Sequence, residues 1–132
     1  DRLPPGTPGT APLLRLDAVL SQSGVLDLHR ARELGLSDGA VDNFLGAGPD
    51  LEPERHRLAD PMSHLPLGVP VYAFHSVEDD TVPVQLSASY VAAARAAGGR
   101  AELILVPGDH FALIDPGSAA MAAVREVLAE LG

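Results

Sequence analysis

Residues 69–83, which read VPVYAFHSVEDDTVP, decide the fold that we predict for this chain. The run over residues 69–76 is short and apolar, as is typical of a strand whose two faces are both buried in a parallel sheet. An acidic turn follows it, and Pro83 suits the first turn of a helix that we expect to extend to about Gly98. A buried strand that leads through a polar turn into a helix is the repeating unit of α/β folds.

The same alternation continues on both sides of this stretch. Residues 101–107, AELILVP, form a second apolar run of strand length, and Ser118 is a suitable N-cap for a last helix with one apolar face. Upstream, apolar and polar residues alternate over residues 16–21, which predicts the first strand. We therefore expect an α/β domain with about three parallel strands and flanking helices.

The segment between the first and second predicted strands is less regular. Residues 27–35 and 38–46 predict two short helices, with Asp27 and Ser37 as their N-caps. Residues 48–68 are interrupted by four prolines, so we expect a connection there with no more than one short helical turn.

The composition of the chain excludes several classes of function. Its 132 residues carry a formal net charge of −9, which disfavours nucleic acid and anionic membrane surfaces as partners. The absence of cysteine excludes disulfides, thiol catalysis and cysteine-based zinc sites. No other pattern in the sequence indicates a cofactor or a metal site.

The start of the chain, residues 1–14, is rich in proline and glycine and is predicted to be a loop or linker. It contains no signal-peptide pattern, and no apolar run in the chain approaches the length of a membrane span, so we expect a cytoplasmic protein. The chain opens on Asp1 rather than on a methionine, and a loop-like segment comes first. We therefore expect a piece of a longer protein, whose true N-terminus could change the expected location.

Two clusters of polar residues follow the two apolar strands, at the edge where parallel α/β sheets bind their ligands. The residues in these clusters are His75, Glu78, Asp79 and Asp80 after the first strand, and Asp109 and His110 after the second. If the strands are neighbours, an aspartate from one loop faces a histidine from the next, and its carboxylate fixes the tautomer of the imidazole. The alternative is that the acids are solvated turn residues and that the histidine caps a loop.

Three short motifs give these clusters a more specific meaning. HSVEDDTVP, over residues 75–83, resembles the H-G-x-x-D-x-x-V-P segment of α/β-hydrolases of the esterase and prolyl-oligopeptidase type. GDHF, over residues 108–111, resembles the G-x-x-H-F or G-x-G-H turn of the same proteins, and SGVLDL, over residues 23–28, resembles a stretch that follows their sixth strand. The resemblance implies that residues 15–132 are the C-terminal part of an α/β-hydrolase fold, with residues 26–67 as a lid or pocket wall.

Carried over residue by residue, the resemblance implies that Asp79 is the acid of a catalytic triad and that His110 is its base. Asp79 is preferred over Asp80 because it occupies the fifth position of the motif. Ser76 stands where the family prefers glycine, and we expect this departure to leave the chemistry unchanged. Glu78 and Asp80 are interpreted as solvated turn acids.

The histidines allow a second interpretation. His75 ends a strand and is expected to be packed there, and surface positions are expected for His29, His56 and His64. A metal site formed by His75, Asp79 and His110 would use standard ligands, but their spacing does not favour it over an acid–base pair.

The nucleophile of such a triad has no convincing candidate in the chain. GLSDG, over residues 35–39, matches the G-x-S-x-G nucleophile elbow, but charged, helix-like residues precede it where an elbow needs a buried strand. Ser37 is better explained as an N-cap. Ser21 and Ser23 lie at a strand end without the two flanking glycines. We expect the serine to lie upstream, on a part of the protein that would also cover the strand at residues 16–21, whose open edge favours self-association.

The function predicted on these grounds is that of a serine hydrolase acting on small-molecule carboxylic esters. This chain would supply the acid and the base and would be inactive by itself. Two alternatives stay open: a serine peptidase of the prolyl-oligopeptidase type, and a non-catalytic α/β module that binds a partner or stabilises an oligomer.

Overall fold

The computed structural model describes residues 14–132, so most of the predicted linker at residues 1–14 lies outside the described residues. Three parallel strands form one sheet in the order β1-β2-β3. Their bounds are Val19–Gln22 for β1, Val71–Ser76 for β2 and Ala101–Val106 for β3. The predicted fold class, an α/β arrangement of parallel strands and flanking helices, is confirmed.

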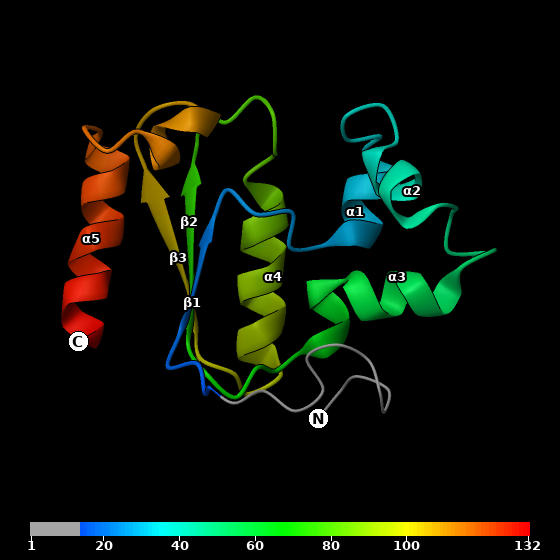
Figure 1. The fold of residues 1–132 in the computed structure, drawn as a ribbon, viewed down its shortest axis with the longest axis horizontal. Coiled ribbons are helices and arrows are strands. Elements are labelled where there is room, and N and C mark those ends of the chain that lie inside the picture. The colour runs from blue at the N-terminus through cyan, green and yellow to red at the C-terminus, as the bar shows by residue number, and fades with distance from the viewer. Residues whose placement is uncertain (1–13) are drawn as a thin grey trace.

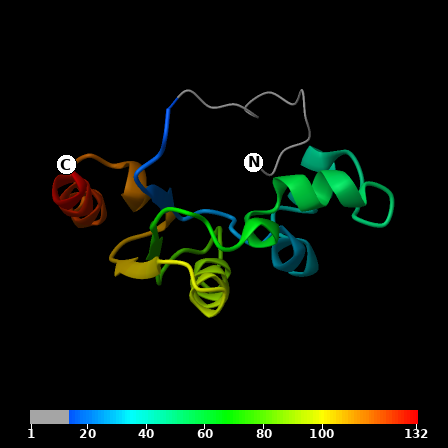
Figure 2. The ribbon, with the colours of Figure 1, turned by 90° about the horizontal axis from the view of Figure 1, so that it is seen from below.

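Helices lie on both faces of this sheet (Figures 1 and 2). The helical elements are α1 Leu28–Glu33, α2 Ala40–Leu45, α3 Pro53–Ala59, the 3₁₀ turn η1 Pro61–His64, α4 Gln85–Ala96, the 3₁₀ turn η2 His110–Ile114 and α5 Ala119–Leu131. Figure 1 shows α4 and α5 on opposite sides of the sheet, with α1, α2 and α3 gathered beyond α4. Among the described helices, none is long and apolar enough to cross a membrane.

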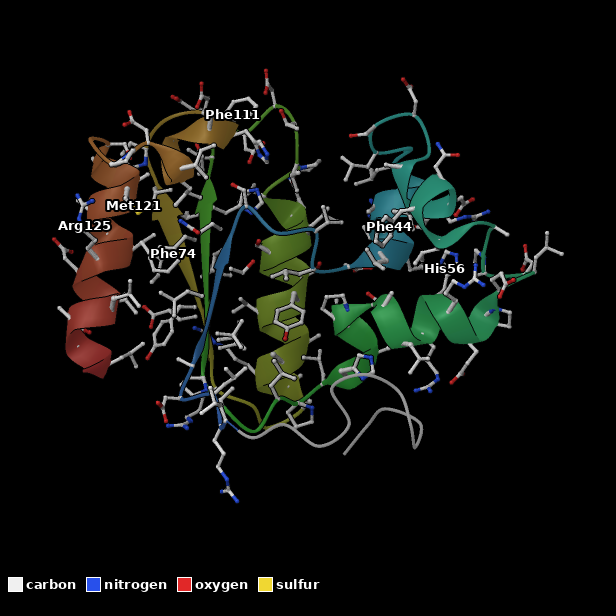
Figure 3. The ribbon with its side chains drawn as sticks, in the orientation of Figure 1. Phe44, His56, Phe74, Phe111, Met121 and Arg125 are labelled. Atoms are coloured by element: carbon white, nitrogen blue, oxygen red, sulfur yellow. The ribbon has the colours of Figure 1, made fainter. Side chains whose placement is uncertain are left out.

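The central strand β2 is buried on both faces because its side chains alternate between two cores. On one face, Val71 and Ala73 pack against Tyr90 and other residues of α4. On the other face, Phe74 packs against Val124 and other residues of α5, and Figure 3 shows its ring between the sheet and that helix. This double burial explains why the strand is a continuous apolar run in the sequence.

Two of the three predicted helix caps are present. The Asp27 carboxylate accepts a hydrogen bond of 2.8 Å from the Arg30 amide at the start of α1. The Ser118 hydroxyl accepts one of 2.9 Å from the Met121 amide at the start of α5. The third prediction, Ser37 as the N-cap of α2, is wrong: Gly39 occupies that position, and Ser37 lies in a left-handed turn with φ +48°.

Two of the predicted elements are also corrected. The first strand covers Val19–Gln22 rather than residues 16–21, because its pairing begins where Val19 meets Val71 of β2. Residues 48–68 contain a helix of two turns and a 3₁₀ turn, more than the single short turn that we expected. Pro53 and Pro61 stand at the first positions of these elements, where a missing N–H costs nothing, so they begin helices instead of interrupting them.

The outer edge of β1 has no strand partner among residues 14–132. An unpaired edge presents free N–H and C=O groups to other chains, so we propose that the 132-residue chain self-associates through this edge. Sedimentation velocity over a range of concentrations is expected to show dimers or larger species. A monomer at all concentrations, with one sharp unfolding transition, would contradict this proposal.

Candidate active site

Two loops at the carboxyl ends of β2 and β3 form the candidate site, and Ser76 joins them. Its hydroxyl, which is fully buried, donates a hydrogen bond to the Gly108 carbonyl in the loop after β3. The same oxygen accepts a hydrogen bond of 3.1 Å from the Glu78 amide in the loop after β2. The serine that replaces the glycine of the family motif therefore connects the two polar clusters, a contact that the sequence did not suggest.

Asp79 and His110 lie together across these loops. Nδ1 of His110 is 2.8 Å from Oδ2 of Asp79, although 31 positions separate the two residues in the chain. The Asp79 side chain is fully buried, and its other oxygen, Oδ1, accepts hydrogen bonds from the amides of Thr81, at 3.0 Å, and Val82, at 2.8 Å. The imidazole of His110 is 24% exposed and is therefore open to solvent on one side.

The environment of Asp79 keeps its carboxyl group ionised. Burial alone raises the pKa of Asp79, but hydrogen bonds from the Val82 amide, His110 and the Thr81 amide, together with the nearby Ser23 hydroxyl, outweigh burial and hold the pKa below its ordinary value. The Ser23 hydroxyl contributes to this lowering, although it is buried and makes no hydrogen bond of good geometry among the described residues. The site therefore contains a carboxylate at neutral pH.

This carboxylate determines which nitrogen of His110 carries hydrogen. A carboxylate can only accept, so Nδ1 of His110 donates to Asp79 and Nε2 of the neutral ring has a free lone pair. Within residues 14–132, no side chain or backbone group makes a hydrogen bond to that Nε2. The arrangement can take up a proton at Nε2 and stabilise the resulting imidazolium through Asp79.

The other acids of the two loops face solvent. Glu78 and Asp80 are exposed, as expected for solvated turn residues. The Asp80 carboxylate accepts a hydrogen bond of 3.1 Å from the neighbouring Thr81 hydroxyl. Asp109 caps η2, with its carboxylate accepting a 3.0 Å hydrogen bond from the Phe111 amide.

Two of the remaining four histidines, His56 and His64, are more buried than we expected. His75 is fully buried, in agreement with the prediction of a packed strand-end residue. His56, predicted at the surface, is only 8% exposed, because its Nε2 bonds to the Ala47 carbonyl at 2.7 Å between α2 and α3 (Figure 3). His64 is half-buried and bonds to the Leu58 carbonyl at 3.0 Å, while His29 is exposed. In residues 14–132 no group of three histidine or acidic side chains could hold a metal ion.

All eight serines of the chain fall within the described residues, and none makes a hydrogen bond to His110. Ser37 lies in the exposed turn between α1 and α2, which Figure 1 places on the far side of α4 from η2. That turn follows a helix rather than a strand, so GLSDG does not have the structure of a nucleophile elbow. Ser21 lies in β1, and Ser23 follows β1 with φ +47° in the connection to α1. The Ser23 side chain is buried near Asp79, and the two glycines that flank the serine of an elbow are absent from SQSGV.

The surface around His110 is open and partly apolar. The ring of Phe111 is 62% exposed and meets the imidazole edge to face, with a centroid distance of 5.2 Å (Figure 3). A hollow of about 380 Å³ lies beside η2, but neither Asp79 nor His110 lines it. A second hollow, of about 280 Å³, lies at the opposite ends of β2 and β3. The acid is therefore buried behind a base that is partly open to solvent, and neither of them lines one of these two hollows.

No protein-family model matches the sequence, and no curated protein matches it. Solved structures do match. Esterase 2 of Thermogutta terrifontis, phosphoramylated by tabun, is 26% identical with a TM-score of 0.60, over 88% of this chain and 42% of the esterase. The propionate-bound form of this esterase is 25% identical, with a TM-score of 0.61.

Two further structures share the fold at lower identity. Acylaminoacyl peptidase of Pyrococcus horikoshii is 21% identical with a TM-score of 0.64, and the chain covers 19% of it. A truncated carbohydrate esterase from gut microbiota is 23% identical with the same TM-score, and the chain covers 42% of it. The chain thus spans less than half the length of the structures that it matches.

Proposed function

Because the chain has the fold of the C-terminal portion of an α/β-hydrolase, we propose that it supplies the acid and the base of a serine hydrolase that acts on carboxylic esters. One observation carries this proposal. A buried, ionised Asp79 binds Nδ1 of His110 at 2.8 Å, where the loops after β2 and β3 meet, and leaves Nε2 available. This is the arrangement that a histidine general base requires.

In the proposed reaction, a serine hydroxyl attacks the ester carbonyl while Nε2 of His110 takes the hydroxyl proton. The imidazolium that forms is stabilised by the carboxylate of Asp79, which stays ionised throughout. Nε2 then returns the proton to the alkoxide leaving group, and an acyl-enzyme remains on the serine. Water then attacks the acyl-enzyme while His110 takes a proton from it. His110 returns this proton to the serine oxygen, and the carboxylic acid product is released.

The nucleophile in this proposal comes from outside the 132 residues. No serine of the chain bonds to His110, and β1 has an unpaired outer edge within residues 14–132. A strand that paired with that edge would end beside the same loops and could bring a nucleophile elbow to Nε2. The chain alone is then an inactive part of the enzyme.

We prefer carboxylic esters as substrates because the Thermogutta terrifontis structures, which are 25% and 26% identical to this chain, are those of an esterase. A serine peptidase is the second candidate, supported by the fold shared with acylaminoacyl peptidase. Ester hydrolysis and peptide hydrolysis use the same acid and base, so the presence of Asp79 and His110 does not distinguish an esterase from a peptidase. A non-catalytic module is the outcome if no serine ever reacts.

A fluorophosphonate probe, read by intact mass and peptide mapping, tests the proposal. We expect no adduct on the 132-residue chain, and one adduct per molecule on an extended protein that includes the coding sequence before Asp1. The Ser37→Ala variant of the extended protein is the control, and we expect it to react as fully as the unaltered protein. An adduct on Ser37 would identify a self-sufficient hydrolase, and an unreactive extended protein would favour the non-catalytic module.

A further inference from the structure

Asp79 lies between two imidazole rings, of which the proposed reaction uses one. Its Oδ2 is 2.8 Å from Nδ1 of His110 and 3.4 Å from Nε2 of His75. The side chains of His75 and Asp79 are both fully buried. His75 takes no part in the proposed proton transfer, although it is buried beside the acid. Its role is therefore either to support the fold or to position Asp79.

The hydrogen bonds of His75 fix its tautomer. Nε2 is 2.8 Å from the Val82 carbonyl, and a carbonyl can only accept, so Nε2 carries a hydrogen. Nδ1 is 2.7 Å from the hydroxyl of Ser87, which is fully buried on α4. In the neutral ring Nδ1 is the acceptor, so the Ser87 hydroxyl donates to it and holds the hydrogen on the side of Val82.

Val82 then connects His75 to the acid. Its carbonyl accepts from Nε2 of His75, and its amide donates to Oδ1 of Asp79 at 2.8 Å. Oδ2 of Asp79 lies 3.4 Å from the same Nε2 without a hydrogen bond to it, a distance at which the polar N–H still attracts the carboxylate. The turn that presents the carboxylate is therefore attached to the end of β2 and to α4 through one imidazole.

We propose that His75 is a positioning residue that orients the Asp79 carboxylate toward His110. Nε2 of His75 donates to the Val82 carbonyl and so holds the turn that carries Asp79. The Ser87 hydroxyl keeps the hydrogen on Nε2 by donating to Nδ1. The catalytic meaning of this role rests on the proposed function, because aiming Asp79 matters for turnover only if His110 is the base. The geometric part does not depend on activity. Without His75 the Val82 end of the turn loses this attachment, and we expect the bond between Asp79 and His110 to lengthen or break.

Two variants of His75 separate its two nitrogens. In His75→Gln, the side-chain amide reaches the position of Nε2 and can donate to the Val82 carbonyl. In His75→Asn, the shorter amide reaches the position of Nδ1 and leaves the Val82 carbonyl without a donor. We expect His75→Gln to preserve the bond between Asp79 and His110 and His75→Asn to disrupt it.

The bond is measured in the 132-residue chain by NMR, from the downfield-shifted proton on Nδ1 of His110 and its nitrogen-15 shift. We expect this signal to persist in His75→Gln and to be lost or moved upfield in His75→Asn. Ser87→Ala removes the hydroxyl that fixes the tautomer of His75 and is expected to weaken the His110 signal. This variant provides a test even if His75→Asn fails to fold. Ser89→Ala, on the same helix, is the matched control and is expected to leave the signal unchanged.

In the extended protein, His75→Asn is expected to lower kcat on the order of 10²-fold with little change in KM, since a misplaced acid slows proton transfer without altering substrate contacts. An unaltered His110 signal in both folded His75→Asn and Ser87→Ala would overturn the proposal, as would its absence from the unaltered chain. An extended protein with no activity would overturn the proposed function instead, and the NMR signal would still report on the positioning role of His75.

Discussion

His110→Ala is expected to lower the turnover of the extended protein by about 10⁴- to 10⁶-fold, the range seen when the base of a serine hydrolase triad is removed. The reason is that Nε2 of His110 both takes the proton of the serine and returns it to the leaving group. Alanine can neither take up nor return a proton, and the serine hydroxyl is a weak nucleophile without a base. KM is expected to change little, because the imidazole contributes to the transition state rather than to substrate binding.

The measurement is the hydrolysis of a chromogenic ester, with kcat and KM determined separately. His29→Ala is the matched control, because the His29 side chain is 73% exposed on α1 and contacts Glu33 at the helix surface. We expect that control to keep full activity. Unchanged turnover in His110→Ala would remove His110 from the mechanism and leave the proposed function without its base.

Asp79→Asn is expected to lower turnover by about 10⁴-fold while leaving the shape of the site intact. An asparagine amide that donates to Nδ1 of His110 favours the tautomer with hydrogen on Nε2, where the lone pair is needed. It also carries no charge to stabilise the imidazolium. Asp80→Asn is the matched control, because Asp80 is the exposed neighbour in the same turn. An effect of equal size in both variants would contradict the assignment of Asp79 as the acid.

The same Asp79→Asn variant gives a second readout in the 132-residue chain, its stability as a function of pH. Hydrogen bonds hold the pKa of Asp79 below its ordinary value in the folded protein. The ionised carboxylate therefore stabilises the fold above the ordinary pKa of an aspartate, about 4, and this contribution is lost as the pH falls through the lower, folded pKa. In urea unfolding, the free energy of unfolding of the unaltered chain is expected to exceed that of the variant most at pH 7. This difference is expected to become smaller toward acidic pH. A difference in free energy of unfolding that does not depend on pH would contradict the lowered pKa of Asp79.

The strands and long helices of this protein could be predicted because their signals are local. The apolar runs at β2 and β3 reflect burial on both faces, and the N-cap at Ser118 is a contact within one helical turn. The short helices were harder. Pro53 and Pro61 have the same sequence signature whether they interrupt a segment or begin a helix, and only the surrounding packing decides between these outcomes.

The candidate site could be predicted in part for the same reason. Two neighbouring parallel strands bring their carboxyl ends to one edge of the sheet, so an aspartate after one and a histidine after the other are expected to be close. The structure places Asp79 and His110 in contact there. The roles of Ser76, Ser87 and His75 could not be predicted, because each hydrogen bond joins residues that are distant in the sequence and leaves no periodic signal.

By itself the sequence determined the class of fold, the order of its main strands and helices, and the edge of the sheet at which its polar residues collect. These features follow from hydrophobic periodicity and strand direction, which are properties of short segments. Only the tertiary structure decided that Ser76 ties the two loops together, that His75 is held by Ser87 and Val82, and that His56 is buried. Those outcomes depend on hydrogen bonds and burial between segments that meet only when the chain is folded.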